Sequence, residues 1–457
     1  MLPKSMLPKK ASLTIVSFGA LILFLELAKF ARPFAPDAAL DFRPRTTTAP
    51  EEPARPRPQF TVLTKAPTVV GPNLIDQRES LRTFYQALWR TEAREPGAVT
   101  RILHYGDSPV TADSITADVR SLLQEHYGDA GHGFVLIAKP WAWYGHRGVD
   151  VRGSGWHIEA ASQSRAHDGF HGVGGVSFDG RTGATSQLVL HEDHARMEIK
   201  YLRQPGGGSL AVQADGASLG NVETEGQEKQ PAFKMFDLPA GARNIDLIVE
   251  RGPVRMFGVS FEKNGPGVIY NSLGLNGGQV QMVVRYFEKT QWTVELQHEQ
   301  PDLVVVNYGT NESLYADYIE RYYPGELREV IRRIKNAVPK ASLLVMSPMD
   351  RGERNALGQI TTPPALPRLV EIQRQIAAET GCAFFNTFQA MGGEGTMARW
   401  YESQPRLVSA DFMHPLPAGA KKVGVLLDQA LEAGFRQFKA RQEQRLAEHA
   451  PAKGTEQ

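Results

Sequence analysis

The sequence contains very little cysteine and no excess of charge of either sign. Its 457 residues include one cysteine, which excludes an internal disulfide framework but not an oxidising compartment. Lysine and arginine number 51, aspartate and glutamate 50. This balance provides no broad positive field, so we expect no nucleic-acid partner. The single thiol, Cys382, lies in the apolar run GCAFFN, where we expect it to pack in a core.

A long apolar run occurs once, near the N-terminus. Residues 1–10 contain three lysines, and residues 11–30 are apolar except for Glu26 and Lys29. A membrane-spanning helix needs about 20 largely apolar residues, and basic flanking residues stay cytoplasmic. We therefore predict a single-pass anchor over residues 1–31, with the rest of the chain outside the cytoplasm. A cleaved signal peptide is the alternative.

The remaining chain divides by composition. Residues 32–72 are rich in proline and charge and lack an apolar period, which is typical of a semi-extended linker. From residue 73, continuous apolar runs alternate with helical patterns, as in RILHY before 112–127 and DLVVVNYG before 318–338. Further helices are expected at 279–290, 366–380 and 418–431. This alternation predicts a doubly wound α/β domain with a parallel sheet.

The alternation stops between residues 151 and 262. Apolar residues there recur at every second position, as at Ile245, Leu247 and Val249, and the turn signals PGGGS, ADGAS and PAGAR separate the runs. Many short strands with glycine-rich turns predict an all-β sandwich. We expect it to be inserted in a loop of an α/β domain built from 73–150 and 263–440, with a tail at 441–457.

Four short polar segments follow predicted strands of the α/β domain. They are GDS at 106–108, NSLGLNGG at 271–278, NYGTNES at 307–313 and DFMHP at 411–415. Ligands of such sheets bind at the carboxyl ends of the strands. In this order, the segments resemble the four sequence blocks of the SGNH/GDSL hydrolase superfamily. The resemblance covers 101–108 and about 267–431, and it implies a flavodoxin-like hydrolase domain with a jelly-roll-like insert.

The residue types in these segments suit acyl transfer by a serine. A serine hydroxyl becomes a useful nucleophile when a neighbouring imidazole accepts its proton. We therefore assign Ser108 as nucleophile and His414 as base, with Asp411 orienting the histidine. The family resemblance further implies an oxyanion hole formed by the backbone N–H groups of Ser108 and Gly277 and the side-chain amide of Asn311.

Each of these residues also has a purely structural interpretation. Ser108 can act as a helix N-cap, Asn311 as a turn residue and Gly277 as a glycine that permits positive φ. Asp411 can cap the last helix, and His414 can lie on the surface. Five such roles at once are improbable, so we favour the catalytic interpretation.

Two neighbouring acidic residues complete this part of the pattern. We expect Asp107 to hydrogen-bond within the turn rather than to take part in catalysis. Glu312 occupies a position after Asn311 where the family often has aspartate. The charge type is preserved, so the donor role expected of Asn311 is unaffected.

Other candidate sites receive structural interpretations. The aromatic cluster Trp141, Trp143 and Tyr144 can stack on sugar rings, but packing at a domain joint is favoured. The segment HEDH at 191–194 lacks the spacing of a common metal site and is expected to form a polar loop. The glycines of GDAGHG lack the context of a dinucleotide fold. No metal or organic cofactor is expected.

The segment LLQEHYGDAGHGFV at 122–135, together with the predicted β-sandwich after it, resembles one branch of the superfamily. That branch includes peptidoglycan O-acetylesterases with an inserted carbohydrate-binding-module-like domain. It implies a serine esterase that removes O-acetyl groups from peptidoglycan or another exported polysaccharide, on the periplasmic side of the inner membrane. A cleaved N-terminal segment would instead leave a periplasmic or secreted protein. The alternatives are a polysaccharide O-acetyltransferase with the same site and a non-catalytic polysaccharide-binding protein. The oligomeric state stays open.

Overall fold

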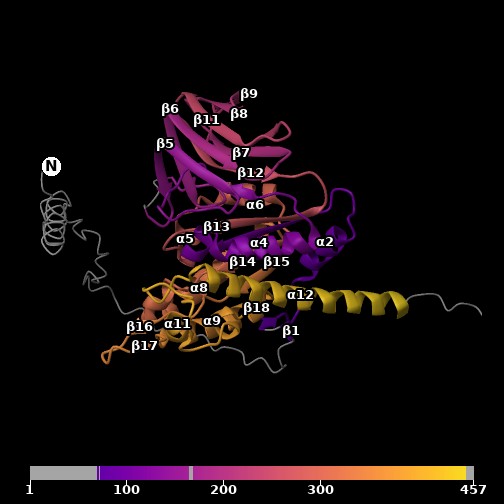
Figure 1. Cartoon of the computed structure of the whole chain (residues 1–457), viewed down its shortest axis with the longest axis vertical. Helices are drawn as coiled ribbons and strands as arrows, with labels where there is room; N and C mark the ends of the chain where they lie inside the picture. The colour runs from indigo at the N-terminus through magenta and orange to yellow at the C-terminus, as the bar shows by residue number, and fades with distance from the viewer. Residues whose placement is uncertain (1–68, 72, 164–167, 449–457) are drawn as a thin grey trace, which may run out of the picture. The chain divides into compact units, whose positions relative to one another are not determined.

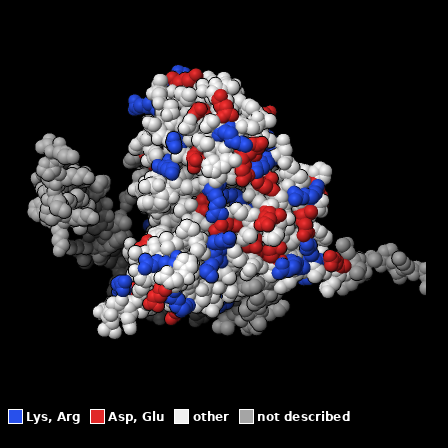
Figure 2. Space-filling view, viewed as in Figure 1, with Lys and Arg blue, Asp and Glu red and all other residues white. Residues whose placement is uncertain are grey.

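The computed structural model describes residues 69–71, 73–163 and 168–448 (Figure 1). The predicted membrane anchor and nearly all of the predicted linker lie outside these ranges. No helix within the described ranges is long and apolar enough to span a membrane. On the face seen in Figure 2, basic and acidic side chains are interspersed, in keeping with the balanced charge.

One sheet has the α/β pattern that the sequence predicts. Five of its seven strands are parallel neighbours, in the order β13-β3-β14-β15-β18, and two short antiparallel strands extend the β18 edge. In chain order the parallel strands read 2-1-3-4-5, which is the flavodoxin-like order. The strands are β1 (Val69–Gly71), β2 (Leu74–Ile75), β3 (Val99–Gly106), β13 (Gly267–Gly274), β14 (Leu303–Asn307), β15 (Ser342–Met346) and β18 (Ala383–Phe385).

Helices cover both faces of this sheet, which explains why its strands carry apolar residues on both faces. On β14, Val304 and Val306 join one buried cluster, whereas Leu303 and Val305 join the other. The first face packs against α5 (Val280–Arg285), α6 (Lys289–Glu299), α8 (Tyr323–Ala337) and α9 (Ala365–Thr380). The second packs against α2 (Arg82–Glu92), α4 (Ser114–Tyr127) and α12 (Pro417–Glu448).

Some helices differ from their predicted bounds. The stretch 279–290 contains α5 and the start of α6, because Phe287 turns into the core and the Glu288 side chain caps α6 through Gln291 N. The stretch 318–338 contains the end of α7 (Ala316–Arg321) and then α8, which has Pro324 in its first turn. Helix α12 continues well beyond residue 431. The shorter elements are α3 (Ser108–Thr111), η1 (Glu312–Leu314), α10 (Thr387–Ala390), α11 (Thr396–Glu402), β16 (Glu353–Arg354) and β17 (Ile360–Thr361).

The β-rich region forms a nine-stranded antiparallel sheet. In the order of hydrogen-bonded strands, β10 and β9 are the two ends of the sheet. Nevertheless, Lys234 of β10 donates a hydrogen bond to the carbonyl of Asn221 in β9. This contact brings strands from the two ends of the sheet together. Its strands are β4 (Gly133–Val135), β5 (Val149–Ala160), β6 (Val176–Leu190), β7 (Arg196–Arg203), β8 (Ser209–Ala214), β9 (Ala217–Glu223), β10 (Gln230–Asp237), β11 (Asn244–Arg251) and β12 (Val254–Glu262).

This sheet begins before the predicted boundary at residue 151. Strand β5 starts at Val149, and β4, which lies within the stretch expected to belong to the α/β domain, pairs with β12. The described residues all belong to one compact unit. The two sheets are therefore joined by packing as well as by the chain.

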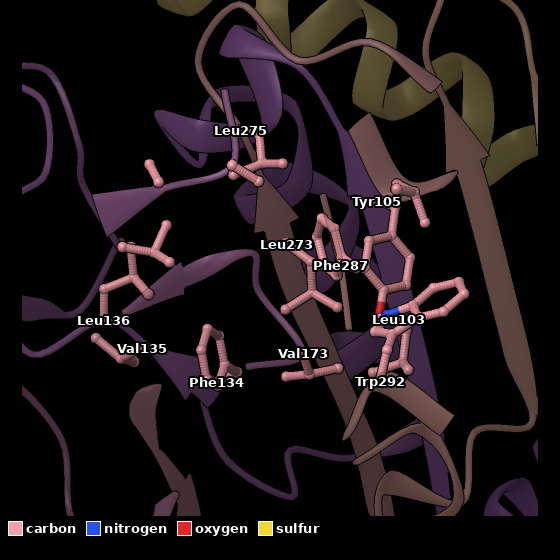
Figure 3. Packing of buried hydrophobic residues seen from close by; sticks show 14 of the residues in the cluster. Leu103, Tyr105, Phe134, Val135, Leu136, Val173, Leu273, Leu275, Phe287 and Trp292 are labelled. Carbon is pink, nitrogen blue, oxygen red and sulfur yellow. The ribbon is translucent and has the colours of Figure 1, made fainter. Parts of the chain in front are cut away.

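A shared apolar core forms the joint between the two sheets (Figure 3). The ring of Phe134 in β4 packs directly against Gly258, since a Cβ atom added to this glycine would lie 2.4 Å from the ring. On the α/β side, Trp292 donates a hydrogen bond from Nε1 to the hydroxyl of Tyr105, at 3.1 Å. Phe287 lies against the same tryptophan ring. The joint is thus a buried apolar core that both sheets share.

We predict that Phe134→Ala destabilises both sheets together. Removing a buried phenylalanine costs about 3–5 kcal/mol through lost burial and the cavity that remains. Because the core is continuous, chemical unfolding followed by far-UV circular dichroism and by tryptophan fluorescence should give one coincident transition, shifted to lower denaturant. Two separated transitions would contradict a shared core. Leu357→Ala, at a highly exposed position, is the control.

Candidate active site

Three loops meet at one edge of the parallel sheet because their strands are neighbours in register. Gly106 at the end of β3 pairs with Gly274 of β13 on one side and Asn307 of β14 on the other. Ser108 lies two residues beyond Gly106, at the start of α3. The first and third strands of a 2-1-3-4-5 sheet flank the topological switch point, where such folds bind ligands.

Side chains of the β14 loop tie it to the β13 loop. Asn311 donates a hydrogen bond from Nδ2 to the carbonyl of Gly278, at 2.9 Å. Glu312, fully buried, accepts one from the backbone N–H of Val280 at 2.7 Å, the first residue of α5. In turn, Leu275 N donates to the carbonyl of Gly106. The three loops are therefore linked by hydrogen bonds.

A fourth loop brings Asp411 and His414 to this edge. It is closed by a bridge between Val408 and Pro415 and by a hydrogen bond from Ser409 N to the His414 carbonyl. Phe412, in the left-handed region at φ 58°, offers its carbonyl to the N–H of Gly352 at 2.8 Å. This contact joins the loop to the segment that follows β15.

Ser108, His414 and Asp411 form one hydrogen-bonded chain. Ser108 Oγ lies 2.7 Å from His414 Nε2, and His414 Nδ1 lies 2.6 Å from Asp411 Oδ2. With the Nδ1 proton donated to the carboxylate, Nε2 can accept the proton of the serine hydroxyl. This is the arrangement of a general base next to a nucleophile.

The surroundings of Asp411 keep its carboxylate ionised. Burial raises its pKa, but hydrogen bonds from the Ser409 hydroxyl, the His414 ring and the backbone N–H groups of Met413 and His414 outweigh burial and lower the pKa well below its usual range. An ionised carboxylate holds the imidazole in one tautomer and stabilises the imidazolium that forms when the base takes up a proton.

The expected oxyanion donors are available at the same edge. Among the described residues, the backbone N–H groups of Ser108 and Gly277 donate to no protein atom. Gly277 has φ of +68°, and a Cβ built there meets nothing within 4 Å. Asn311 uses one amide hydrogen on Gly278 and retains the other. These donors lie on the three linked loops, with Ser108 on the central one.

The comparisons with known proteins agree with this geometry. Residues 249–422 match the model of the GDSL-like Lipase/Acylhydrolase family. This confirms the resemblance to the SGNH/GDSL hydrolases. The match includes Gly277, Asn311, Asp411 and His414. Ser108 precedes it, because the β-rich region separates β3 from the later strands of the sheet.

The structure of a peptidoglycan O-acetylesterase shares this fold. The two sequences are 23% identical, and the TM-score is 0.65. The aligned region covers 78% of the present chain and 96% of the esterase chain. The salicylyl-acyltransferase SsfX3 is 14% identical, and the match covers 66% of the present chain and 96% of SsfX3. The C-terminal CBM6 of LamC from Zobellia galactanivorans is also 14% identical, and the match covers 25% of the present chain and 99% of that module. Their TM-scores of 0.31 and 0.19 are too low to support an argument. A search of curated proteins found no match.

Two buried carboxyl groups are next in sequence to residues of the expected site: Asp107 precedes Ser108, and Glu312 follows Asn311. Burial raises the pKa of Asp107 to about 6, opposed by a hydrogen bond with Thr310 and by the nearby imidazole of His414. Burial also raises the pKa of Glu312 to about 8, opposed by its bond from Val280 and reinforced by the charge on Asp107. Glu312 is therefore mostly protonated at neutral pH, which keeps negative charge away from the proposed oxyanion.

The other candidate sites of the sequence do not join the triad. Within HEDH, His194 is buried against His132, whereas His191 is exposed and contacts Asp150. Across the ranges that the structure describes, no group of three histidine, cysteine or acidic side chains could hold a metal ion. Trp141 and Tyr144 are buried, whereas Trp143 is exposed.

Sequence reasoning missed the segment after β15. There, Gly352 contacts Phe412, and the buried Arg351 lies 3.5 Å from the hydroxyl of Ser313, two residues beyond Asn311. The segment SPMDRG thus braces both the histidine loop and the asparagine loop. Its position directly after the fourth parallel strand was the available signal, because ligand sites collect loops from neighbouring strand ends.

Glu312 provides a test of how the loops are held. Glu312→Gln keeps a neutral acceptor for Val280 N, so we predict kcat/KM within about threefold of wild type. Glu312→Ala removes the acceptor and loosens two loops with oxyanion donors, so we predict a loss of about tenfold or more. Steady-state ester hydrolysis measures both, with melting temperatures to check folding. Equal activity of the two variants would show that the bond is unimportant.

Asp107 gives a prediction of stability against pH. A carboxyl group whose pKa is higher in the folded than in the unfolded chain stabilises the fold in its protonated form. Its contribution to the free energy of unfolding is complete below the unfolded pKa and is lost as pH rises through about 6. From pH 3 to pH 8 the loss should reach about 3 kcal/mol. Urea unfolding of wild type and Asp107→Asn across this pH range should therefore show that the free energy of unfolding of wild type falls relative to that of the variant. Parallel curves would refute the assignment.

Proposed function

We propose that this protein is a serine carbohydrate esterase that removes O-acetyl groups from a cell-wall or exported polysaccharide. The observation that carries the proposal is the hydrogen-bonded chain Ser108–His414–Asp411 beside a set of unpaired N–H donors. The acylhydrolase family match supports the reaction type. The fold shared with a peptidoglycan O-acetylesterase supports an acetylated glycan as the substrate class.

The proposed reaction has two halves. Ser108 Oγ attacks the ester carbonyl as its proton passes to His414 Nε2, and the tetrahedral oxyanion is held by the N–H groups of Ser108 and Gly277 and the amide of Asn311. His414 then protonates the departing sugar hydroxyl, which leaves acetyl-Ser108. Water, activated by His414, attacks this ester, acetate is released, and the serine recovers its proton.

Solvent access favours hydrolysis over acetyl transfer. The side chains of His414 and Asp411 are 44% and 49% exposed, so water can reach the face of the acetyl-enzyme where the base acts. An acetyltransferase would instead have to favour a sugar hydroxyl over this water. The non-catalytic alternative is disfavoured because every residue of the expected site is present and linked.

The proposed setting follows from the N-terminal sequence. A helix formed by residues 11–30 would anchor the chain in the inner membrane and leave the esterase in the periplasm, where cell-wall and exported glycans lie. Removal of this segment as a signal peptide would give a periplasmic or secreted enzyme. We also propose that the β-rich region, about 151–262, contributes to glycan binding.

Ester hydrolysis by the purified chain tests the proposal. Wild type should hydrolyse p-nitrophenyl acetate and release acetate from O-acetylated peptidoglycan or exported polysaccharide without any added acceptor. Ser108→Ala and His414→Ala should lower kcat by about 10³-fold or more. Mass spectrometry of candidate glycans before and after exposure identifies the acetyl groups removed.

Two outcomes would replace this proposal. Acetylated product that forms only when an acceptor glycan is supplied would favour the transferase. If wild type is as inactive as both variants on every ester, the non-catalytic polysaccharide-binding alternative would replace the esterase.

A further inference from the structure

The aromatic turn, residues Trp141–Tyr144, places its three rings in different surroundings. Trp141 and Tyr144 are 5% and 8% exposed, whereas Trp143 is 55% exposed. A hydrogen bond from Tyr144 N to the Trp141 carbonyl closes the turn at 3.0 Å, and the Tyr144 hydroxyl accepts one from Leu136 N at 2.8 Å. Two rings therefore anchor the turn in the core, and the third stands at its tip.

The tip of this turn lies beside the proposed oxyanion hole. Trp143 donates a hydrogen bond from Nε1 to the side-chain oxygen of Asn276 at 3.2 Å, and Asn276 directly precedes Gly277. Gly145, two residues after Trp143, approaches the nucleophile segment, since a Cβ built there would lie 3.7 Å from the carbonyl of Ala112 just beyond α3. The turn thus contacts the loop that carries Gly277, and Gly145 just after the turn lies close to the residue that ends α3.

The exposed ring is placed for binding rather than for packing. Trp141 and Tyr144 already anchor the turn, so stability does not require a large apolar ring between them in water. The bond to Asn276 uses the polar edge of the indole and fixes the ring, which reduces the entropy lost on binding a ligand. A fixed aromatic face with its polar edge occupied suits a flat, partly apolar ligand.

We propose that Trp143 forms a sugar subsite, on which a pyranose ring of the O-acetylated glycan stacks through its C–H face while a nearby acetyl ester occupies the serine site. The proposal rests on the proposed function and names the contact that selects a glycan over a small ester. Trp143 binds substrate but exchanges no proton or bond with it.

A comparison of two substrates tests the subsite. In the full chain, Trp143→Ala should leave kcat/KM for p-nitrophenyl acetate within about twofold, because that ester is too small to reach the ring. For soluble O-acetylated peptidoglycan fragments it should lower kcat/KM about tenfold, mostly through KM. Trp143→Phe retains an aromatic face and should recover much of the loss. Leu357→Ala is the matched surface control.

A binding measurement separates this proposal from the proposed function. Calorimetry compares Ser108→Ala with Ser108→Ala/Trp143→Ala against the same fragments, and the double variant should bind about tenfold more weakly. If wild type releases no acetate yet this difference is found, the subsite holds and the esterase proposal fails. If wild type releases acetate and Trp143→Ala changes neither KM nor affinity, the esterase holds and the subsite is refuted.

A structural role for Trp143 gives a different result. If the ring merely supports the Gly277 loop, Trp143→Ala should lower kcat for both substrates by the same factor, and Asn276→Ala should reproduce the loss. That outcome would also overturn the subsite.

Discussion

The position of β3 between β13 and β14 is the constraint on which the site depends. Backbone pairing places Gly106 level with Gly274 and Asn307, so three loops that are far apart in sequence leave the sheet side by side. Ser108 follows the central strand and therefore lies between the loops that carry Gly277 and Asn311. The hydrogen bond from Ser108 to His414, across 306 positions, completes the site only because the Asp411–His414 loop reaches this same edge.

Buried polar contacts then hold these loops in place. Glu312 and Asn311 bond to the β13 loop, and Gly352 bonds to Phe412 in the histidine loop. Such contacts are effective because the groups are shielded from water, where competing hydrogen bonds would weaken them. The same shielding raises the pKa of Glu312 to about 8, so this brace between the loops is mostly uncharged at neutral pH.

The β-rich region is part of this arrangement and not a separate attachment. Phe134 of β4 and Trp292 of α6 belong to one buried cluster, and the segment between β4 and β5 carries the aromatic turn to the Gly277 loop. The long insertion thus supplies a side chain at the edge of the site while leaving the parallel sheet intact.

The amino-acid sequence alone determined the α/β class and the β-rich region, because strand and helix periodicities are local properties. Its short motifs predicted Ser108, Asp411 and His414, and the family resemblance of those motifs implied Gly277 and Asn311. It did not separate the roles of Trp141, Trp143 and Tyr144, nor find the contact of Gly352 with Phe412. It also missed the break at Phe287 and the early start of the β-rich sheet at β4. These depend on which surfaces meet in space, so burial and hydrogen bonding between distant segments decided them, and only the tertiary structure contains that information.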